Sequence, residues 1–446
     1  MSGEQREEGL RLTRQLGLRT ATAVVVGETI AVGIFLTPAG MAKSLGSPLW
    51  LLLVWLLMGA MALCGALCYG ELAARFPEAG GGYVYLREAY GRPVAFLYGW
   101  MAFLVMDPGI TAALAVGMAG YAGFVFGLSP LGLKALAVAS ILVLAAVNVV
   151  GVRAGANLLR WLTVVKLCLL LFVVAWGFAS GRGDWANFVP FAERRPGSMA
   201  LGSALASAFV GAFFSFGGWW DLSKLSGEVR EPERNLPRAL AYGVAVVTLA
   251  YILVSAVFVY LVPLGAVASG ETFAAQAGAA LFGSAGAGVF SAVVVVAVLG
   301  SLAALTMSAP RVYYAMARDR LFFQAAARVN ARTGTPAAAI VMQAALASLL
   351  VALGTFEGIV AYFVFVAVLF VGLTVAATFP LRRARGGAPA FAAPGYPLTQ
   401  AVFLILVTLL LVLLAAGSPL QAALGTAVVA LGLPVYYVLF RGKGLT

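Results

Sequence analysis

The chain has 446 residues, of which 62% are hydrophobic and 10% are charged, and its mean hydropathy is +0.99. A soluble domain is about half apolar and about a quarter charged, so this composition excludes an ordinary water-soluble fold. An open sheet would leave backbone groups unpaired in lipid. The long apolar runs also lack the strict alternation of a membrane barrel. We therefore expect an all-α membrane protein.

Residue types that are scarce or missing exclude further functions. There is no histidine, which removes imidazole proton relays, histidine-based metal sites and histidine-dependent hydrolysis. The three cysteines, Cys64, Cys68 and Cys168, fall in apolar runs, where we expect them to pack rather than to form disulfides or a metal site. No cofactor, metal or enzymatic activity is predicted. The charged start of the chain predicts no removable signal peptide.

Apolar runs of about 20 residues predict twelve membrane-spanning helices. In chain order they lie near 20–42, 49–73, 93–126, 131–149, 158–180, 202–226, 238–263, 282–318, 336–355, 357–380, 399–417 and 419–440. Because this number is even, both termini are expected on the same side of the membrane.

The distribution of Lys and Arg orients these spans. Of the 29 basic residues, 23 fall in the segments on the side of the termini, 5 fall in the opposite segments, and Lys166 lies inside a span. The positive-inside rule then predicts a multi-pass protein of the cytoplasmic (inner) membrane with both termini cytoplasmic. This topology also explains the net charge of +12, so we expect no nucleic-acid partner.

Two spans carry glycine at mid-membrane depth. The first contains GETIAVGIF (27–35) and the sixth contains FFSFGGWW (213–220). Their positions correspond if the single transport domain, 1–446, contains inverted repeats at 18–180 and 202–381 and a helix pair at 399–440. Paired, glycine-interrupted helices of this kind are typical of a transporter's binding site. The alternative is that these glycines only allow close helix packing.

The chemistry of such a site follows from the backbone. The second half of a broken helix begins with free N–H groups and a positive dipole end, which suit a carboxylate. The first half ends with free carbonyls, which suit an ammonium. A site with both features at the middle of the membrane favours an amino acid zwitterion as substrate, with the lipid bilayer as the protein's surroundings.

Six segments carry a family resemblance. They are GETIAVGIFLTP (27–38), ELAARFPEAGGGYVYLREAYG (71–91), NVVGVRAGANLLRWLTVVKL (148–167), NFVPF (187–191), FSFGGWWDLSKLSGEVREPERNLPRAL (214–240) and MARDRLFFQAAARVNARTGTPAAA (316–339). In this order they resemble the amino acid–polyamine–organocation superfamily, close to bacterial relatives of the L-amino acid transporter branch. The resemblance covers nearly the whole chain. It implies a five-plus-five inverted-repeat (LeuT-like) fold with two extra helices, and amino acid transport by alternating access.

The resemblance also implies which residues meet the substrate. The carboxylate is expected at the N–H groups of Val32, Gly33 and Ile34, and the ammonium at the carbonyls of Thr29, Ile30, Phe214 and Ser215, beside Gly217. Phe214 is similar to the aromatic residue that closes over the substrate, and Phe216 is similar to its neighbour.

The sequence departs from the family pattern in three places. Ala31 and Val32 replace the usual Gly-Ser, so a hydroxyl contact to the carboxylate is missing. Trp220 replaces a small polar residue and is expected to narrow the pocket. The loop 127–134 lacks the cysteine with which animal light chains join a heavy chain, so no disulfide-linked heavy chain is expected.

Lys166 matches a fifth-span lysine that replaces a sodium ion in related transporters. The resemblance implies that its ammonium holds the ends of the broken first helix, with Ser301 as a second contact, and that transport is independent of sodium. The alternative is a lysine that reaches the cytoplasmic face. At ~12 Å into its helix, Lys166 is too deep for this to be easy.

Two acidic residues inside spans leave alternatives open. Glu28 lies just before the first break, where the helix dipole disfavours a carboxylate. Pairing with Lys166 or protonation would relieve this cost. Either would favour a proton that moves with the transport cycle. A fixed ion pair or exposure to the cytoplasmic vestibule is the structural alternative. Asp107, before Pro108, either binds a cationic group or a proton, or satisfies backbone freed by the proline, and we favour the latter.

The remaining charges have simpler interpretations. Asp221 and Lys224, spaced i, i+3, are expected to form a local pair. Glu228 and the charges after it are expected to form a solvated cytoplasmic exit, and the charged loop 71–92 to be solvated and to contribute to an inner gate.

The predicted function is sodium-independent exchange of neutral L-amino acids. The alternatives are a proton-coupled symporter and a carrier of cationic amino acids or polyamines. A channel would need rings of polar residues, and an enzyme would need a catalytic cluster, and the sequence indicates neither.

Overall fold

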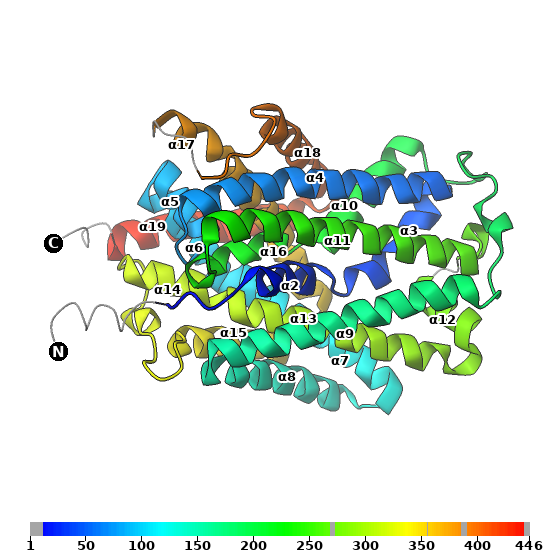
Figure 1. The fold of residues 1–446 in the computed structure, drawn as a ribbon, viewed down its shortest axis with the longest axis horizontal. Helices are drawn as coiled ribbons and strands as arrows, with labels where there is room; N and C mark the ends of the chain where they lie inside the picture. Colours follow the sequence, from blue (N-terminus) through cyan, green and yellow to red (C-terminus); the bar gives the residue numbers. More distant parts are fainter. Residues whose placement is uncertain (1–11, 268–272, 355, 385–389, 441–446) are drawn as a thin grey trace.

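The computed structural model describes residues 12–440 except 268–272, 355 and 385–389. Within this part of the chain the fold is all helical, and the only strand-like pairing is the bridge between Leu16 and Val229. The first and last described residues lie at the same end of the helical bundle (Figure 1). We call this end the terminal end.

The helices match the predicted spans. In the described residues, ten helices are long and apolar enough to cross a membrane, and the bent pair α2 (Leu18–Thr29) and α3 (Gly33–Leu45) makes eleven. The shorter apolar helix α15 (Ala337–Leu353) occupies the ninth predicted span. The fold is therefore that of a multi-pass, all-α membrane protein.

The other elements follow in chain order. They are α4 (Pro48–Arg75), α5 (Gly82–Tyr90), α6 (Arg92–Met101), the π-helical η1 (Ala102–Met106), α7 (Asp107–Phe126), α8 (Pro130–Val150), α9 (Val152–Ala179), η2 (Trp185–Phe188), α10 (Leu201–Phe216), η3 (Trp219–Glu228), α11 (Pro232–Leu261), η4 (Leu264–Ala266), α12 (Phe273–Phe282), η5 (Gly283–Ala285), α13 (Gly286–Ser308), α14 (Pro310–Arg318), η6 (Gln324–Ala327), α16 (Phe356–Ala376), α17 (Thr378–Ala384), α18 (Leu398–Gly417) and α19 (Pro419–Leu439). The elements η2 to η6 are 3₁₀ helices.

Both predicted helix breaks are present. The axes of α2 and α3 meet at 48°. In the second break, α10 ends at Phe216 and η3 begins at Trp219, with two glycines between them. A β-carbon on Gly33 would lie 2.6 Å from the Cα of Ser215, so only glycine allows α3 to approach α10. Gly218 has a φ of +106°, which L side chains rarely adopt. The glycines thus serve both close packing and helix interruption.

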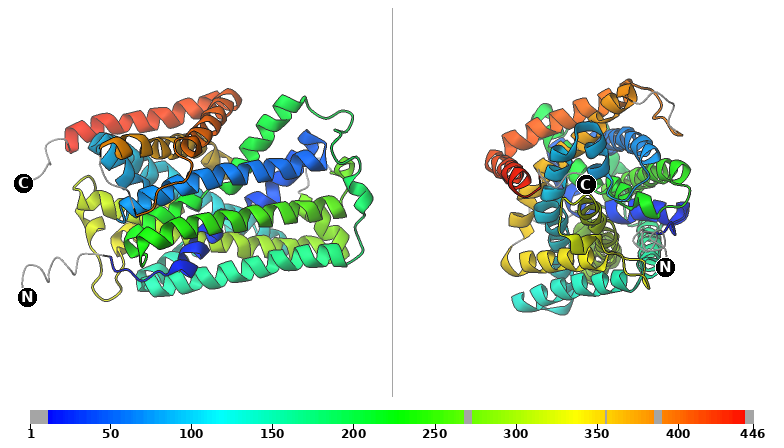
Figure 2. Two further views of the ribbon diagram at one scale, coloured as in Figure 1. Left: turned by 45° about the horizontal axis from the view of Figure 1, so that its top comes forward. Right: turned by 90° about the vertical axis from the view of Figure 1, so that its left-hand side faces the viewer.

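Helices of the first predicted repeat pack against their counterparts in the second. α4 lies along α11, α7 packs against α13, and α3 packs against α10 (Figure 1). With each broken helix counted as one span, these pairs are the second with the seventh, the third with the eighth, and the first with the sixth. The pair α18 and α19 lies along one side of the bundle (Figure 2). The repeat boundaries 18–180 and 202–381 and the helix pair 399–440 stay predictions.

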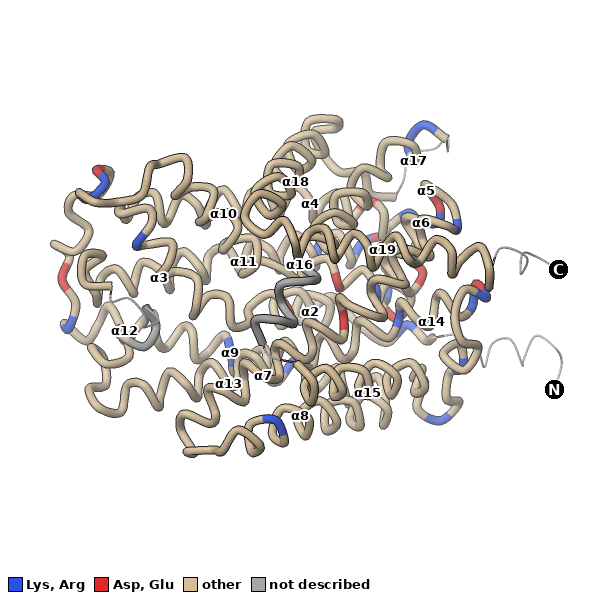
Figure 3. The backbone as a smooth tube through the Cα atoms, turned by 180° about the vertical axis from the view of Figure 1, so that it is seen from behind, with Lys and Arg blue, Asp and Glu red and all other residues tan. Residues whose placement is uncertain are grey.

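Charged residues gather toward the terminal end and are sparse along the rest of the bundle (Figure 3). This agrees with the predicted asymmetry of Lys and Arg. Five basic residues that entered that count lie outside the described residues: Arg6, Arg11, Arg385, Arg441 and Lys443.

A buried ion pair joins α14 to η3 near the terminal end. The Arg311 guanidinium donates to both carboxylate oxygens of Glu228, at 2.6 and 3.1 Å, and neither side chain is more than 1% exposed. The Glu228 carbonyl accepts from the N–H groups of Gln15 and Leu16, which ties the start of the chain to η3. The prediction of a solvated Glu228 is therefore wrong, because α14 brings a guanidinium against it.

A second set of ion pairs joins α5 to the end of α14. Asp319 accepts from the Arg87 guanidinium and the Tyr83 hydroxyl, each at 2.7 Å. Within the loop 71–92, however, Glu71 is buried and paired with Arg382, so the prediction of a solvated loop is wrong at that residue. These contacts close the bundle at the terminal end.

We predict that Glu228→Ala strongly destabilises the fold, because it leaves the Arg311 guanidinium buried without a counter-charge. Breaking a buried ion pair costs about 3–5 kcal/mol, so the unfolding temperature in detergent should fall by several degrees. Glu233→Ala, at an exposed position on the same segment, is the control and should change little. An unchanged unfolding temperature in Glu228→Ala would contradict this assignment.

Candidate functional site

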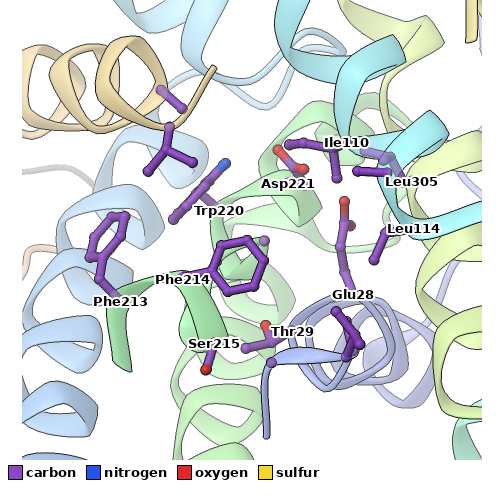
Figure 4. Close-up of a pocket in the computed structure, with 18 residues that line it drawn as sticks. Glu28, Thr29, Ile110, Leu114, Phe213, Phe214, Ser215, Trp220, Asp221 and Leu305 are labelled. Carbon is purple, nitrogen blue, oxygen red and sulfur yellow. The ribbon is translucent and has the colours of Figure 1, made fainter. Parts of the chain in front are cut away.

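A cavity of about 850 Å³, including its open mouth, lies where the two helix breaks meet (Figure 4). Of the residues predicted to bind substrate, those lining the cavity are Thr29, Val32, Gly33, Phe214, Ser215 and Gly217. Trp220 lines it as well and stacks on Phe213, with ring centroids 6.2 Å apart. The crossing of α3 and α10 thus brings together residues that are 182 positions apart in sequence, as in Gly33 and Ser215.

Three predicted binding residues do not line the cavity. The Ile30 carbonyl accepts hydrogen bonds from Lys166 and Ser301 instead. Phe216 packs against Trp55 and Tyr251. Ile34 is fully buried in the first turn of α3, so only its N–H group remains a predicted contact. The backbone turn at the first break directs the Ile30 carbonyl toward Lys166 of α9. The adjacent residue Thr29 lines the cavity instead.

Tyr251 of α11 links the two breaks and was missed by the sequence analysis. Its hydroxyl lies 2.9 Å from the Thr29 carbonyl oxygen and 2.7 Å from that of Ser215. The Thr37 hydroxyl lies 2.8 Å from the Ser215 hydroxyl, which adds a link between α3 and α10. Two of the carbonyls predicted to receive an ammonium therefore already have a protein partner.

Lys166 bridges the end of α2 to α13. Its ammonium donates to the Gly27 carbonyl at 2.8 Å, to the Ile30 carbonyl, and to the Ser301 hydroxyl at 3.3 Å. Ser301 in turn donates to the Gly27 carbonyl at 2.7 Å. The expected contact with Ser301 is present, and the ammonium is 1% exposed, so it does not reach the surface. The alternative that Glu28 pairs with Lys166 is wrong, because the ammonium is directed to the backbone carbonyls.

A buried ion-pair network lies behind the cavity. The Lys224 ammonium is 2.8 Å from an Asp107 carboxylate oxygen and 2.9 Å from one of Asp221. The Tyr313 hydroxyl donates to the other oxygen of Asp107 at 3.2 Å. The predicted Asp221–Lys224 pair is confirmed. The prediction that the Asp107 carboxyl satisfies freed backbone is wrong, because η3 places Lys224 against it.

One part of the cavity wall is apolar. It comprises Ile110, Ala113 and Leu114 of α7, Leu305 of α13, and Val364 and Ala367 of α16. The sequence analysis missed these residues. The i, i+3, i+4 spacing on α7, one turn after Asp107, was the available signal, but it is shared by every apolar helix face in this chain.

Comparison with known proteins identifies the family. The amino acid permease family matches residues 16–440. The chain belongs to this family.

The most informative relatives are transporters. The serine/threonine exchanger SteT of Bacillus subtilis is 30% identical over 442 residues, 97% of this chain and 98% of that protein. The human b(0,+)-type amino acid transporter 1 is 30% identical over 383 residues, 84% of this chain and 77% of that protein. The human large neutral amino acids transporter small subunit 2 is 29% identical over 450 residues, 96% of this chain and 81% of that protein.

These relatives support the interpretation of the fold and site. The chain is an amino acid transporter of the amino acid–polyamine–organocation superfamily, with the five-plus-five fold and two broken helices that the resemblance implied. The relatives are named as transporters and exchangers rather than enzymes. In this permease the cavity at the breaks is the candidate substrate site.

We predict that Lys166→Met impairs both stability and transport. The variant keeps the length of the side chain but leaves the Gly27 and Ile30 carbonyls without their ammonium donor, and each unsatisfied buried group costs about 1–3 kcal/mol. The unfolding temperature and the transport rate in proteoliposomes should both fall. Lys134→Met, at an exposed lysine on α8, is the matched control. Wild-type behaviour of Lys166→Met would show that the bridge is dispensable.

Proposed function

We propose that this permease exchanges neutral L-amino acids across the cytoplasmic membrane, independently of sodium. The observation that carries the proposal is the cavity itself, in which backbone groups of two broken helices adjoin an apolar wall. An amino acid offers the matching groups, namely a carboxylate, an ammonium and a side chain. The apolar wall favours side chains such as those of leucine, valine and phenylalanine.

The substrate carboxylate is best placed at the start of α3. The first N–H groups of a helix have no partner within the helix, and the dipole there is positive. Val32 and Gly33 bring this helix end to the cavity. Because Val32 has no hydroxyl, the carboxylate would be held by backbone N–H groups, with those of Gly33 and Ile34 contributing.

Sodium independence is supported by Lys166. A fixed ammonium already binds the carbonyls at the end of α2 and the hydroxyl of Ser301. Carbonyl and hydroxyl oxygens are the ligands that hard cations prefer. Since these are occupied by an ammonium, we infer that no sodium ion is needed to hold the break together.

Orientation and partners are part of the proposal. The gathering of charges at the terminal end supports placing that end, and both termini, in the cytoplasm. The cysteines Cys64, Cys68 and Cys168 are free, and the loop 127–134 has none, which supports a permease without a disulfide-linked heavy chain.

A second candidate is a carrier of cationic amino acids or polyamines. Asp107 does not favour it, since its carboxylate lies outside the cavity and is paired with Lys224. Glu28 and Asp221 do favour it, because both carboxyl groups line the cavity. The substrate panel below therefore includes cationic compounds.

We predict that labelled leucine or a similar neutral amino acid accumulates only in proteoliposomes that contain unlabelled amino acid. Replacing sodium by choline should leave the rate unchanged. The panel should include serine, phenylalanine, arginine and putrescine, and empty vesicles with an inward proton gradient serve as the control. Uptake into empty vesicles under that gradient would indicate symport instead. Uptake restricted to arginine or putrescine would favour the second candidate.

We predict that Ala113→Leu changes the size selectivity of the permease. The larger side chain fills part of the space beside the apolar wall. Uptake of leucine and phenylalanine should therefore fall about 4- to 15-fold relative to alanine, since losing the burial of one or two methylenes costs about 0.8 kcal/mol each. Ala135→Leu, at an exposed position on α8, should behave as wild type. An equal loss for small and large substrates would contradict the assigned side-chain pocket.

A further inference from the structure

Two carboxyl side chains face each other in the wall of the cavity. Glu28 lies in the last turn of α2 and Asp221 in the first turn of η3. They point toward each other (Figure 4), and the Glu28 Oε2 atom is buried without a hydrogen-bond partner. Both are buried, with exposed fractions of 7% and 2%. Two buried carboxylates that face each other repel, so this arrangement favours a proton on one of them.

The local charge balance supports the same requirement. Three carboxyl groups, those of Glu28, Asp107 and Asp221, surround one ammonium, that of Lys224, which contacts the two aspartates. With all three ionised, the buried cluster would carry two uncompensated negative charges. Such charges are strongly disfavoured away from water, and a proton shared between adjacent carboxyls removes one of them.

In the part of the chain that the structure describes, no cation forms an ion pair with Glu28. From α9, Lys166 directs its ammonium to backbone carbonyls. From α11, the Tyr251 hydroxyl lies against the carbonyls of Thr29 and Ser215. From α13, the Ser308 hydroxyl lies 3.5 Å from one Glu28 oxygen, a marginal hydrogen bond.

Behind Asp221 the remaining titratable groups are already paired with each other. Asp107 of α7 is bound by Lys224 of η3 and by the Tyr313 hydroxyl of α14. Asp221 is the carboxyl residue of this cluster that lines the cavity wall together with Glu28.

The helix ends decide which carboxyl carries the proton. Asp221 lies at the positive, N-terminal end of η3 and contacts Lys224, and both features stabilise its ionised form. Glu28 lies at the negative, C-terminal end of α2, which destabilises a carboxylate. The proton is therefore more stable on Glu28, and the protonated carboxyl of Glu28 is oriented to donate a hydrogen bond to the Asp221 carboxylate.

We propose that Glu28 must be protonated for substrate to bind, so that loading the cavity takes up one proton at any pH at which Glu28 of the empty permease is ionised. This rests on the proposed function, since the substrate carboxylate is placed at Gly33, on the other side of the same break. An ionised Glu28 would add a second negative charge beside Asp221 in the cavity wall, and this charge would repel the substrate carboxylate. Glu28 takes the proton from water on the side where the cavity is open and returns it to water after the substrate has left.

The test compares the pH profile of exchange in wild type and Glu28→Gln, in proteoliposomes loaded with substrate and with equal pH on both sides. Wild-type exchange should fall by up to tenfold per pH unit on the alkaline side of its transition. Glutamine can donate to Asp221 at every pH, so the variant should lose this dependence. Glu193→Gln, the same change at an exposed position, should keep the wild-type profile.

A direct proton measurement completes the test and does not depend on the variant folding. Adding substrate to wild-type permease in weakly buffered detergent, with a pH indicator, should show uptake of one proton per substrate above the transition. If no compound of the panel is exchanged at any pH, the proposed function fails. If exchange occurs but the indicator shows no proton uptake, or Glu28→Gln keeps the wild-type pH profile, the function stands and the role of Glu28 is overturned.

Discussion

The architecture depends on one constraint, which is that a helix interrupted inside a membrane must find partners for its freed backbone groups. At the first break these partners are side chains from three other helices. Lys166 of α9 and Ser301 of α13 bind the carbonyls of Gly27 and Ile30, and Tyr251 of α11 lies against that of Thr29. The carbonyls of the break are thus satisfied by protein, whereas the helix start at Gly33 adjoins the cavity. This asymmetry is the basis on which we propose that the substrate carboxylate binds at the start of α3.

Charge is distributed in the bundle according to the same principle. At the terminal end, the buried carboxylate of Glu228 is paired with the Arg311 guanidinium, and that of Glu71 with the Arg382 guanidinium. Such pairs hold α14, η3, α17 and α4 together where the bundle is closed. Glu28 differs, since in the described residues it has no cation within ion-pairing distance. A carboxyl group that has no cation and lies at the edge of the candidate substrate cavity is better suited to binding and releasing a proton than to forming a fixed structural ion pair.

Much of this could be predicted because lipid imposes local rules on a sequence. The apolar runs predicted the spans to within a few residues at most of their ends, and the glycines at 33 and 217–218 predicted both breaks. Lys166 was identified because it matches a lysine of related transporters, and its depth in the span argued against a side chain that reaches the surface. The predictions for Glu71, Asp107 and Glu228 were wrong, and Ile30 and Phe216 lie outside the cavity that they were expected to line. Their partners, which include Lys166, Tyr251, Lys224 and Arg311, lie on other helices and leave no mark on neighbouring positions.

The sequence by itself determined the class of protein, its helices, the two interruptions and the resemblance that named its family. Each of these follows from composition, apolar run length or a short motif, all of which are properties of contiguous residues. The tertiary structure alone decided that Lys224 neutralises Asp107, that α7, α13 and α16 supply the apolar wall, and that Glu28 faces Asp221. These contacts join residues far apart in the chain, and the energy of a buried charge depends on what lies against it rather than on its neighbours in sequence.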